Sequence, residues 1–314
     1  MNAARETTLD LRACTEAAVA GARAAKLAGP TELATKDDPV LGHHAVVSAA
    51  DYGSQRAILD VLGRAMPKVP VVCEETAEGT WTDAKLGRLA TKRRFVVDEL
   101  DGSASFVSGH HEWSVSVACV DGLAHTAGAV CAPDIQSGLL FHAARGGGAH
   151  LRRGQRPPVR LRVKRRPLRE AYVLTGPDSL LHRYPAHNAL TTSLASECRT
   201  LNVVGSCALA MALVAAGCAS LLVQPLQSVW DWAAGRLLVE EAGGVVLFYE
   251  MDGAKILPVR TLQARHYDPR RRVVGLVAGE RALAREALER LEGLGVEAGR
   301  PPRPRARKRV SSRA

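Results

Sequence analysis

Residues 96–106 read VVDELDGSASF, an apolar strand that runs directly into two aspartates and a turn glycine. Asp98 and Asp101 are three positions apart across this turn, a spacing that lets both carboxylates point to one side with the Leu100 carbonyl exposed between them. Gly102 permits a close backbone approach, and its N–H helps to cradle a phosphate if a helix begins there. The alternative is an Asp-Gly hairpin turn that binds no ligand.

Other acidic residues also stand at the ends of predicted elements. VPVVCEE, a short buried strand, ends in Glu74 and Glu75, and VWDWAAGRLLVEEAGG is a predicted helix that begins at Asp231 and ends at Gly243 and Gly244. Hard divalent cations such as Mg²⁺ prefer several oxygen ligands, which carboxylates from separate elements supply when they converge on one point. The sequence therefore predicts a metal site that two ions could share.

The rest of the chain alternates between predicted helices and strands. The first thirty residues predict a helix with Leu9, Ala13, Ala17 and Ala20 near one face, and a second helix spans about 51–65. The predicted strands are WSVSVACVDG, AHTAGAVCAP and SGLLFHAARGGGAHL, which form an antiparallel meander, and then AYVLTG, TLNVVG, SLLVQP and GVVLFYE. Two more helices are predicted, from Ser206 to about Gly217 and over GERALAREALERLEGLG.

The composition is that of a soluble globular protein, with 314 residues, 46% hydrophobic and 24% charged. No apolar run approaches the roughly 20 residues that a membrane-spanning helix needs, and the N-terminus lacks the apolar core of a secretory signal. Seven cysteines without a CxxC pair favour buried free thiols over a disulfide or zinc framework. We expect a cytoplasmic protein with no membrane partner.

The net charge of +10 is concentrated in two stretches. Residues 300–314 hold six Arg and one Lys without an acid, so the body carries only +3. Residues 145–169 hold ten Lys or Arg, which we interpret as a solvated strand-loop face; a phosphate or nucleic-acid surface is the alternative. We expect no nucleic-acid partner and a disordered tail. The tail leaves a nuclear location open, and its terminal Ser-Arg-Ala is a poor match to a peroxisomal signal.

Three motifs in order, VVCEETAEG, VVDELDGSASFVSG and VWDWAAGRLLVEEAGGVV, resemble the inositol monophosphatases, within the lithium-sensitive, magnesium-dependent sugar-phosphatase superfamily. TKDDP, VVSAAD and VVGSCALAMALVAAG support this resemblance, which spans roughly residues 5–290. It implies an α+β fold, a layered α/β/α/β/α sandwich of the inositol monophosphatase and fructose-1,6-bisphosphatase type. We expect one domain over residues 1–299, with a large antiparallel sheet in its N-terminal half (about 1–170), a smaller sheet in its C-terminal half (about 171–299) and the active site between them.

The resemblance implies a set of metal ligands. Glu74, Asp98 and the Leu100 carbonyl would bind one Mg²⁺, and Asp98, Asp101 and Asp231 a second. Two or three ions are expected in all, together with inhibition by lithium. Such ions would activate a water for hydrolysis without a covalent intermediate.

Residues around these ligands are implied to act on the water. Ser103, where the family commonly has Thr, would orient and help deprotonate the water together with Glu74; a turn or helix cap is its other reading. Asp51, Glu75 and Lys36 are expected beside the ligands, with Lys36 on a mobile, metal-sensitive loop.

The resemblance also implies the substrate contacts. The turn Gly205-Ser206-Cys207 would contact the alcohol portion, and Gln224 falls where inositol-specific members carry a Glu. A neutral Gln gives up charge-assisted hydrogen bonding, so it weakens the expectation of inositol specificity. The full predicted set is Asp101, Gly102, Ser103, Gly205, Ser206, Cys207, Gln224 and Asp231.

The chain departs from the family pattern at a few positions. Glu99 replaces a Pro, and we expect its side chain to point to solvent; a raised metal affinity is the alternative. Ser105 stands where Asn is usual. His43 and His44 are adjacent on an extended segment, so their side chains diverge and we expect surface residues.

The leading hypothesis is a magnesium-dependent phosphoric monoester hydrolase acting on inositol monophosphate or a similar polyol phosphate. Its rivals on the same scaffold are histidinol-phosphate, fructose-bisphosphate and 3′-phosphonucleotide phosphatases. A catalytically weak binding protein is the alternative from another class, although all the ligand carboxylates are present. A homodimer is expected from the resemblance alone.

Overall fold

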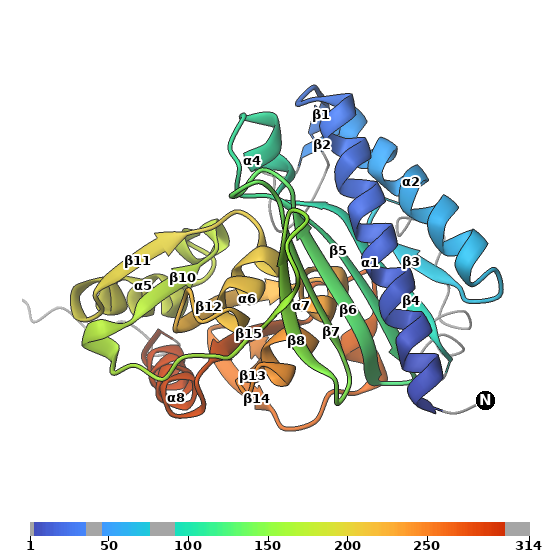
Figure 1. Cartoon of the computed structure of the whole chain (residues 1–314). Coiled ribbons are helices and arrows are strands. Elements are labelled where there is room, and N and C mark those ends of the chain that lie inside the picture. The colour runs from blue at the N-terminus through green and yellow to red at the C-terminus, as the bar shows by residue number, and fades with distance from the viewer. Residues whose placement is uncertain (1–2, 36–45, 76–91, 299–314) are drawn as a thin grey trace, which may run out of the picture.

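The computed structural model describes residues 3–35, 46–75 and 92–298, which build two β-sheets and the helices that cover them (Figure 1). A small two-stranded sheet of β1 (Glu32–Thr35) and β2 (Val46–Ser48) lies apart from the two large ones. Both large sheets have helices on each face, so the described chain forms the five layers of an α/β/α/β/α sandwich. The predicted fold class is confirmed.

The first large sheet has seven strands in the order β3-β4-β5-β6-β7-β8-β9. Only the pair β3–β4 is parallel; the other pairs are antiparallel, as predicted for the meander. The strands are β3 (Val71–Cys73), β4 (Arg94–Asp101), β5 (Ser114–Asp121), β6 (Ala124–Ala132), β7 (Leu139–Ala144), β8 (Gly148–Arg153) and β9 (Val159–Arg160).

The second large sheet has six strands in the order β11-β10-β12-β15-β13-β14. Strands β10, β11 and β12 are parallel to one another, whereas β15 runs antiparallel to β12 and β13. The strands are β10 (Tyr172–Thr175), β11 (Thr200–Val203), β12 (Leu221–Gln227), β13 (Val245–Asp252), β14 (Lys255–Val259) and β15 (Val274–Gly279). Short 3₁₀ helices are η1 (Leu168–Glu170), η2 (Pro177–Leu180) and η3 (Ala264–Tyr267).

Three buried clusters join the layers. Helices α1 (Ala3–Ala28) and α2 (Ala49–Ala65) cover the outer face of the first sheet, and α5 (Pro185–Glu197) and α8 (Arg281–Ala298) cover the outer face of the second. Helices α6 (Cys207–Ala215) and α7 (Val229–Glu241) fill the space between the sheets. The remaining helix, α4 (Ser103–Val107), follows β4 directly.

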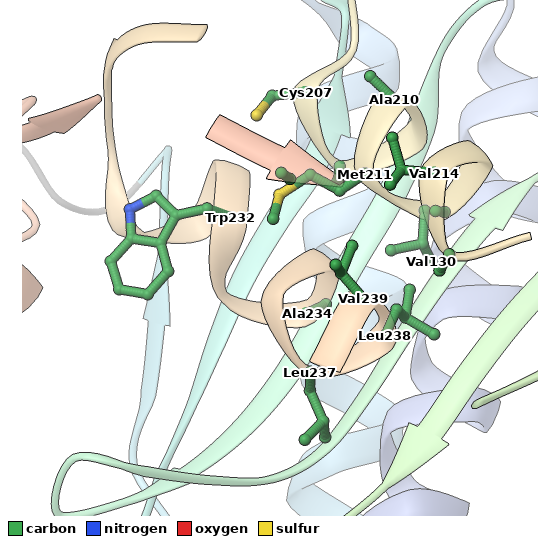
Figure 2. Close-up of a cluster of buried hydrophobic side chains, with 14 of the residues drawn as sticks. Val130, Cys207, Ala210, Met211, Val214, Trp232, Ala234, Leu237, Leu238 and Val239 are labelled. Carbon is green, nitrogen blue, oxygen red and sulfur yellow. The ribbon is translucent and has the colours of Figure 1, made fainter. Parts of the chain in front are cut away.

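The central layer is packed closely because small residues face each other there. Figure 2 shows α6 and α7 in contact through Met211 and Val214 on one helix and residues of α7 on the other. A Cβ added at Gly235 would lie 2.6 Å from the Met211 Cβ, and one added at Gly128 would lie 3.1 Å from the Ala234 Cα. Nearly every α7 side chain is buried, so this helix has no solvent face that a 3.6-residue pattern would reveal.

The predicted face of the first helix is only half right. Ala13 and Ala17 are buried, but Leu9 is 42% exposed and its neighbour Asp10 is fully buried. Asp10 accepts hydrogen bonds from Arg93 and from the Thr126 hydroxyl. At this turn the buried face of the helix is therefore shifted by about one residue from the predicted face.

The expectation of free, mostly buried cysteines is confirmed in the described chain. All seven cysteines are free thiols, five of them buried. The basic stretch lies on β8, β9 and the segment that follows, with Arg156, Arg160, Arg162 and Lys164 exposed. Among the described helices, none combines the length and the apolar character needed to cross a membrane. The tail at 300–314 lies outside the described residues.

Candidate active site

The site begins at an irregularity in β4, a strand whose residues are all buried. Asp98 pairs with Ser116 of β5 and Asp101 with Ser114, so three steps along β4 match two along β5 and the chain bulges. The bulge is closed by the Leu100 N–H, which donates to Asp98 Oδ1 at 3.1 Å. The strand does not turn back as a two-residue hairpin, because helix α4 follows it at once.

Gly102 makes this strand-to-helix connection possible. Its φ of 95° lies in the left-handed region, and a Cβ there would come within 3.1 Å of the Glu112 carbonyl oxygen. A side chain at this position would therefore be strained both by the backbone conformation and by the close contact. The alternative of an Asp-Gly hairpin turn is wrong for this chain, because the strand continues into α4.

Two groups of carboxylates converge on the bulge. Asp98, Asp101 and Asp231 have ligand atoms within 4.8 Å of one another, and so do Glu74, Asp98 and Glu99. Asp98 belongs to both groups. Four separate positions thus contribute: the end of β3, the bulge of β4, its last residue and the first turn of α7. Asp231 is held there by the Ser228 N–H, which donates to its Oδ2 at 2.7 Å.

Burial and mutual repulsion disfavour the charged forms of these acids. Burial raises the pKa of Asp98 well above its usual range, and the nearby charges of Glu74 and Asp101 raise it further. Burial likewise raises the pKa of Asp231 to about 8 and that of Asp101 to about 6. A divalent cation would relieve this repulsion and supply the counter-charge, so the donor set fits Mg²⁺ or a similar hard ion.

Asp101 also joins the first sheet to the N-terminus of α6. Its Oδ2 accepts from the Ser206 hydroxyl and from the Ala208 N–H, both at 2.6 Å, and its Oδ1 accepts from the Cys207 N–H at 3.2 Å. The predicted turn of Gly205, Ser206 and Cys207 therefore does lie at the site. Ala208 was missed by the sequence analysis, since it contributes only a backbone N–H and no side-chain signal.

Ser103 contacts an acid that was expected only beside the ligands. Its Oγ lies 3.0 Å from Asp51 Oδ1 and 2.9 Å from the Leu100 carbonyl oxygen, and its predicted action on a water together with Glu74 stays a prediction. Asp51 is itself fixed in the first turn of α2, where its Oδ2 accepts from both the N–H and the hydroxyl of Ser48. Burial raises the pKa of Asp51, against these hydrogen bonds, which lower it. Asp51 thus contacts the Ser103 hydroxyl directly.

Glu99 points inward, so the expectation that it faces solvent is wrong. It is 1% exposed, and its Oε1 accepts from Gln55 Nε2 at 2.8 Å while its Oε2 accepts from the Glu74 N–H at 3.2 Å. The Ser54 hydroxyl donates to its backbone oxygen at 2.7 Å. These donors on α2 and β3 draw the side chain into the fold, and burial raises its pKa to about 8.

Gln224 lies on β12, in the second large sheet, whereas the bulge belongs to the first. It is 3% exposed, and its side chain lies against Gly176, where any Cβ would overlap the carboxamide. Its Oε1 is buried without a hydrogen-bond partner among the described residues. No hydrogen bond joins Gln224 to the carboxylates in the described chain.

Of the other predicted positions, the structure describes only Glu75. Glu75 is half-buried beside Glu74, outside both carboxylate groups, and its charge raises the pKa of Glu99. Lys36, His43 and His44 lie outside the described residues.

Comparisons with known proteins agree with this geometry. A family profile described as the inositol monophosphatase family matches residues 6–284. The chain is 33% identical over 203 residues to Nus factor SuhB of Pasteurella multocida (strain Pm70), a match that covers 64% of this chain and 70% of that protein. It is also 33% identical over 200 residues to the inositol-1-monophosphatase of Rhizobium meliloti (strain 1021), covering 63% and 70%.

Solved structures share the fold. The extragenic suppressor protein SuhB of Bartonella henselae superposes with a TM-score of 0.67 at 25% identity, covering 92% of this chain and 98% of that one. The IMPase of Thermotoga maritima gives a TM-score of 0.69 at 22% identity, with 94% and 98% covered. The second likeness concerns the fold alone.

Proposed function

The chain belongs to the inositol monophosphatase family, and from that premise we propose that it is a magnesium-dependent phosphatase of small polyol phosphates, with inositol monophosphate as the first candidate. Family membership supports phosphatase activity and metal binding, while relatives named SuhB leave the substrate open. The observation that carries the proposal is the position of Asp98 in two overlapping groups of buried carboxylates.

The ligand assignment follows those two groups. Glu74, Asp98 and the Leu100 carbonyl would hold one Mg²⁺, and Asp98, Asp101 and Asp231 a second. Bound there, the ions would polarise the phosphoryl oxygens and lower the pKa of a water molecule. Asp101 accepts hydrogen bonds from the start of α6 through both oxygens, which fixes its orientation toward the site.

The protein's own proton path runs through Ser103. A hydroxyl that donates to Asp51 Oδ1 keeps its lone pairs for a water hydrogen, so Ser103 can take a proton from the attacking water while passing its own to Asp51. The raised pKa of Asp51 suits it to receive that proton. Glu74, whose charge also raises the pKa of Asp51, would be a metal ligand and would act with Ser103 on the water.

A phosphate-release panel in Mg²⁺ tests the proposal. Inositol 1-phosphate is expected to be hydrolysed, and histidinol phosphate, fructose 1,6-bisphosphate and adenosine 3′,5′-bisphosphate represent the rival enzymes on this scaffold. Rapid release from adenosine 3′,5′-bisphosphate with none from inositol 1-phosphate would replace the proposed substrate class. A purified protein that releases phosphate from none of the four would favour the binding-protein alternative.

We also propose a homodimer, on the strength of the resemblance, and a cytoplasmic location, on the strength of the composition. Light scattering behind a sizing column measures the first, with twice 33.5 kDa expected. Imaging of the full chain against one lacking 300–314 measures the second.

A further inference from the structure

One edge of the six-stranded sheet places a cation near Gln224, the residue expected to contact the alcohol portion of a substrate. Parallel pairing of β10 with β12 aligns Thr175 with Val223, which puts Gly176 beside Gln224. Antiparallel pairing of β12 with β15 aligns Gln227 with Val274, so the residues just before β15 lie at the same edge. Helix α7 begins at this edge too, two residues after Gln227. In sheets with parallel strands, ligands bind beyond the carboxyl ends of the strands.

Arg272 is a partly buried cation at this edge. Its guanidinium lies 3.3 Å from Asp178 Oδ2, on the 3₁₀ helix that follows β10. Its charge reaches the catalytic side as well, since Arg272 lowers the pKa of Asp231 and of Cys207, against the larger effect of burial. The Arg272 side chain is 17% exposed and that of Asp178 13%, so the pair is recessed yet accessible from solvent.

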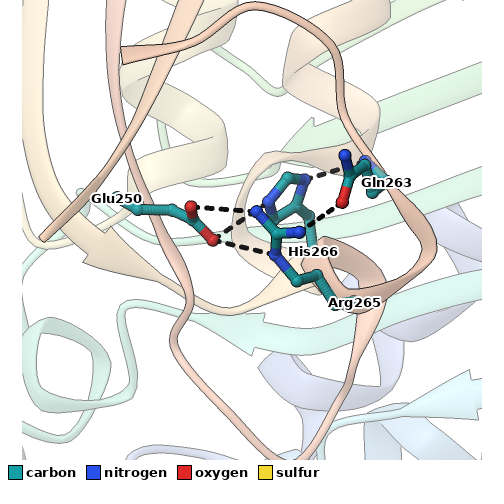
Figure 3. A network of polar contacts seen from close by, with 4 residues as sticks. All are labelled: Glu250, Gln263, Arg265 and His266. Atoms are coloured by element: carbon teal, nitrogen blue, oxygen red, sulfur yellow. Dashed lines mark hydrogen bonds and ion pairs between the residues drawn. The ribbon is translucent and has the colours of Figure 1, made fainter. Parts of the chain in front are cut away.

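The segment that carries Arg272 is anchored from the other side. Figure 3 shows Arg265 and His266 of η3 both bonded to Glu250 of β13, with the Gln263 N–H donating to His266 Nδ1 at 2.8 Å. Since β13 pairs with β15, the chain between η3 and Arg272 is held at both ends. The position of Arg272 is therefore set by the sheet and does not depend on a loose loop.

The Gln224 side chain is uncharged, whereas a Glu at this position would add a negative charge to this edge. Its Oε1 is buried and has no hydrogen-bond partner among the described residues, which points to a donor supplied by a ligand. A neutral carboxamide also does not repel an anion held by Arg272. A guanidinium has five N–H donors, so contact with Asp178 and with a ligand oxygen are compatible.

We propose that Arg272 and Gln224 select a phosphorylated polyol whose alcohol portion carries a second acidic group, a carboxylate or a further phosphate. The inference rests on the proposed phosphatase function and narrows its substrate class. Arg272 would bind the second anion, while a hydroxyl of the polyol would donate to Gln224 Oε1. Hydrolysis itself would proceed at the carboxylate groups around Asp98.

Matched substrates that differ only in the second acid test this assignment. Sorbitol 6-phosphate carries a CH₂OH where 6-phosphogluconate carries a carboxylate. Glycerol 2-phosphate and 2-phosphoglycerate differ in the same way, with the carboxylate closer to the phosphate. The measurement is kcat/KM for all four at saturating free Mg²⁺. We expect the acidic member of at least one pair to be preferred by about tenfold or more.

Variants assign the preference to the named residues. Arg272→Met should reduce the ratio of the two kcat/KM values to about one, and Gln224→Glu should also reduce it by repulsion. Arg271→Met is the matched control, an exposed arginine next in the chain, and should keep the wild-type ratio. Because each readout is a ratio, a general loss of activity through Asp231 cancels. Should Arg272→Met fail to fold, Gln224→Glu decides.

Two results would overturn the inference while leaving the phosphatase function in place. One is an equal or lower kcat/KM for the acidic member of both pairs in the wild-type protein. The other is a preference that survives Arg272→Met or, where that variant does not fold, Gln224→Glu. Absence of phosphate release from these four substrates and from inositol 1-phosphate would instead contradict the proposed function.

Discussion

The Ser103 hydroxyl oxygen lies 3.0 Å from Asp51 Oδ1, although the two residues are 52 positions apart in the chain. Asp51 lies in the first turn of α2 on the outer layer, and Ser103 begins α4 at the end of the bulged strand β4. The contact therefore links the helix that covers the sheet to the carboxylates at its edge. It makes Asp51 a carboxylate within hydrogen-bond distance of the proposed water-activating hydroxyl.

Replacing Ser103 tests this proton path. Ser103→Ala should lower kcat by about 100-fold, because general-base assistance to the water is lost, whereas Ser103→Thr keeps the hydroxyl and should stay within a few fold of wild type. Mg²⁺ binding, measured by calorimetry, should be unchanged in both variants. An alanine variant with nearly full kcat would assign Ser103 to helix capping alone.

A Glu99 variant tests whether this residue contributes to metal binding by the group of Glu74, Asp98 and Glu99. Its side chain lies within 4.8 Å of ligand atoms of Glu74 and Asp98, so Glu99→Gln should weaken Mg²⁺ binding by about tenfold, since ligand charge tunes the affinity for hard cations. Glu75→Gln is the matched control, because Glu75 lies outside both groups. Calorimetric titration of each variant measures the affinity, and an equal loss in both would show a general charge effect.

Much of the site could be predicted because its signals are local. An apolar strand that runs into Asp98, a glycine after Asp101 and a helix that opens near Asp231 are all readable within about ten residues of sequence. The two sheets could be predicted for the same reason, since turn residues interrupt runs of apolar residues. The structure confirms the five-layered fold.

The rest depends on contacts between distant segments. Residues of β4 are buried on both faces, so alternation could not tell whether Glu99 points in or out, and only Gln55 and the Glu74 N–H explain its direction. The pairing of Ser103 with Asp51 has the same origin. Leu9 was misjudged because its neighbour Asp10 takes the buried side of the helix, where Arg93, just before β4, and Thr126 of β6 donate hydrogen bonds to it.

The close packing of α6 and α7 predicts opposite effects for two glycines. Gly235→Ala should lower the free energy of unfolding by about 1–3 kcal/mol, because the added methyl meets Met211. Gly63→Ala on α2 has open space around it and should raise that free energy by up to about 1 kcal/mol through helix propensity. Urea unfolding followed by circular dichroism measures both, and a stabilising Gly235→Ala would contradict the described contact between the helices.

Removal of metal should make stability fall as pH rises. Glu99 and Asp231 have folded-state pKa values of about 8, above the unfolded values near 4, so the stability they contribute is complete below pH 4 and is lost as pH rises through 8. In chelator, the free energy of unfolding should fall by about 2 kcal/mol per pH unit between pH 6.5 and 8, since both groups contribute. Saturating Mg²⁺ should flatten this slope, and an identical slope with and without Mg²⁺ would place the ion elsewhere.

The central claim is that Asp98 organises a metal-dependent phosphatase site, and phosphate release by chelator-treated protein tests it most directly. With inositol 1-phosphate and the acidic polyol phosphates as substrates, we expect no release until Mg²⁺ is added and full release once it is restored. Asp98→Asn should lower kcat/KM by at least about 1000-fold at any Mg²⁺ concentration, since it removes the carboxylate shared by both groups. Release that persists in chelator, or that survives Asp98→Asn, would contradict the claim.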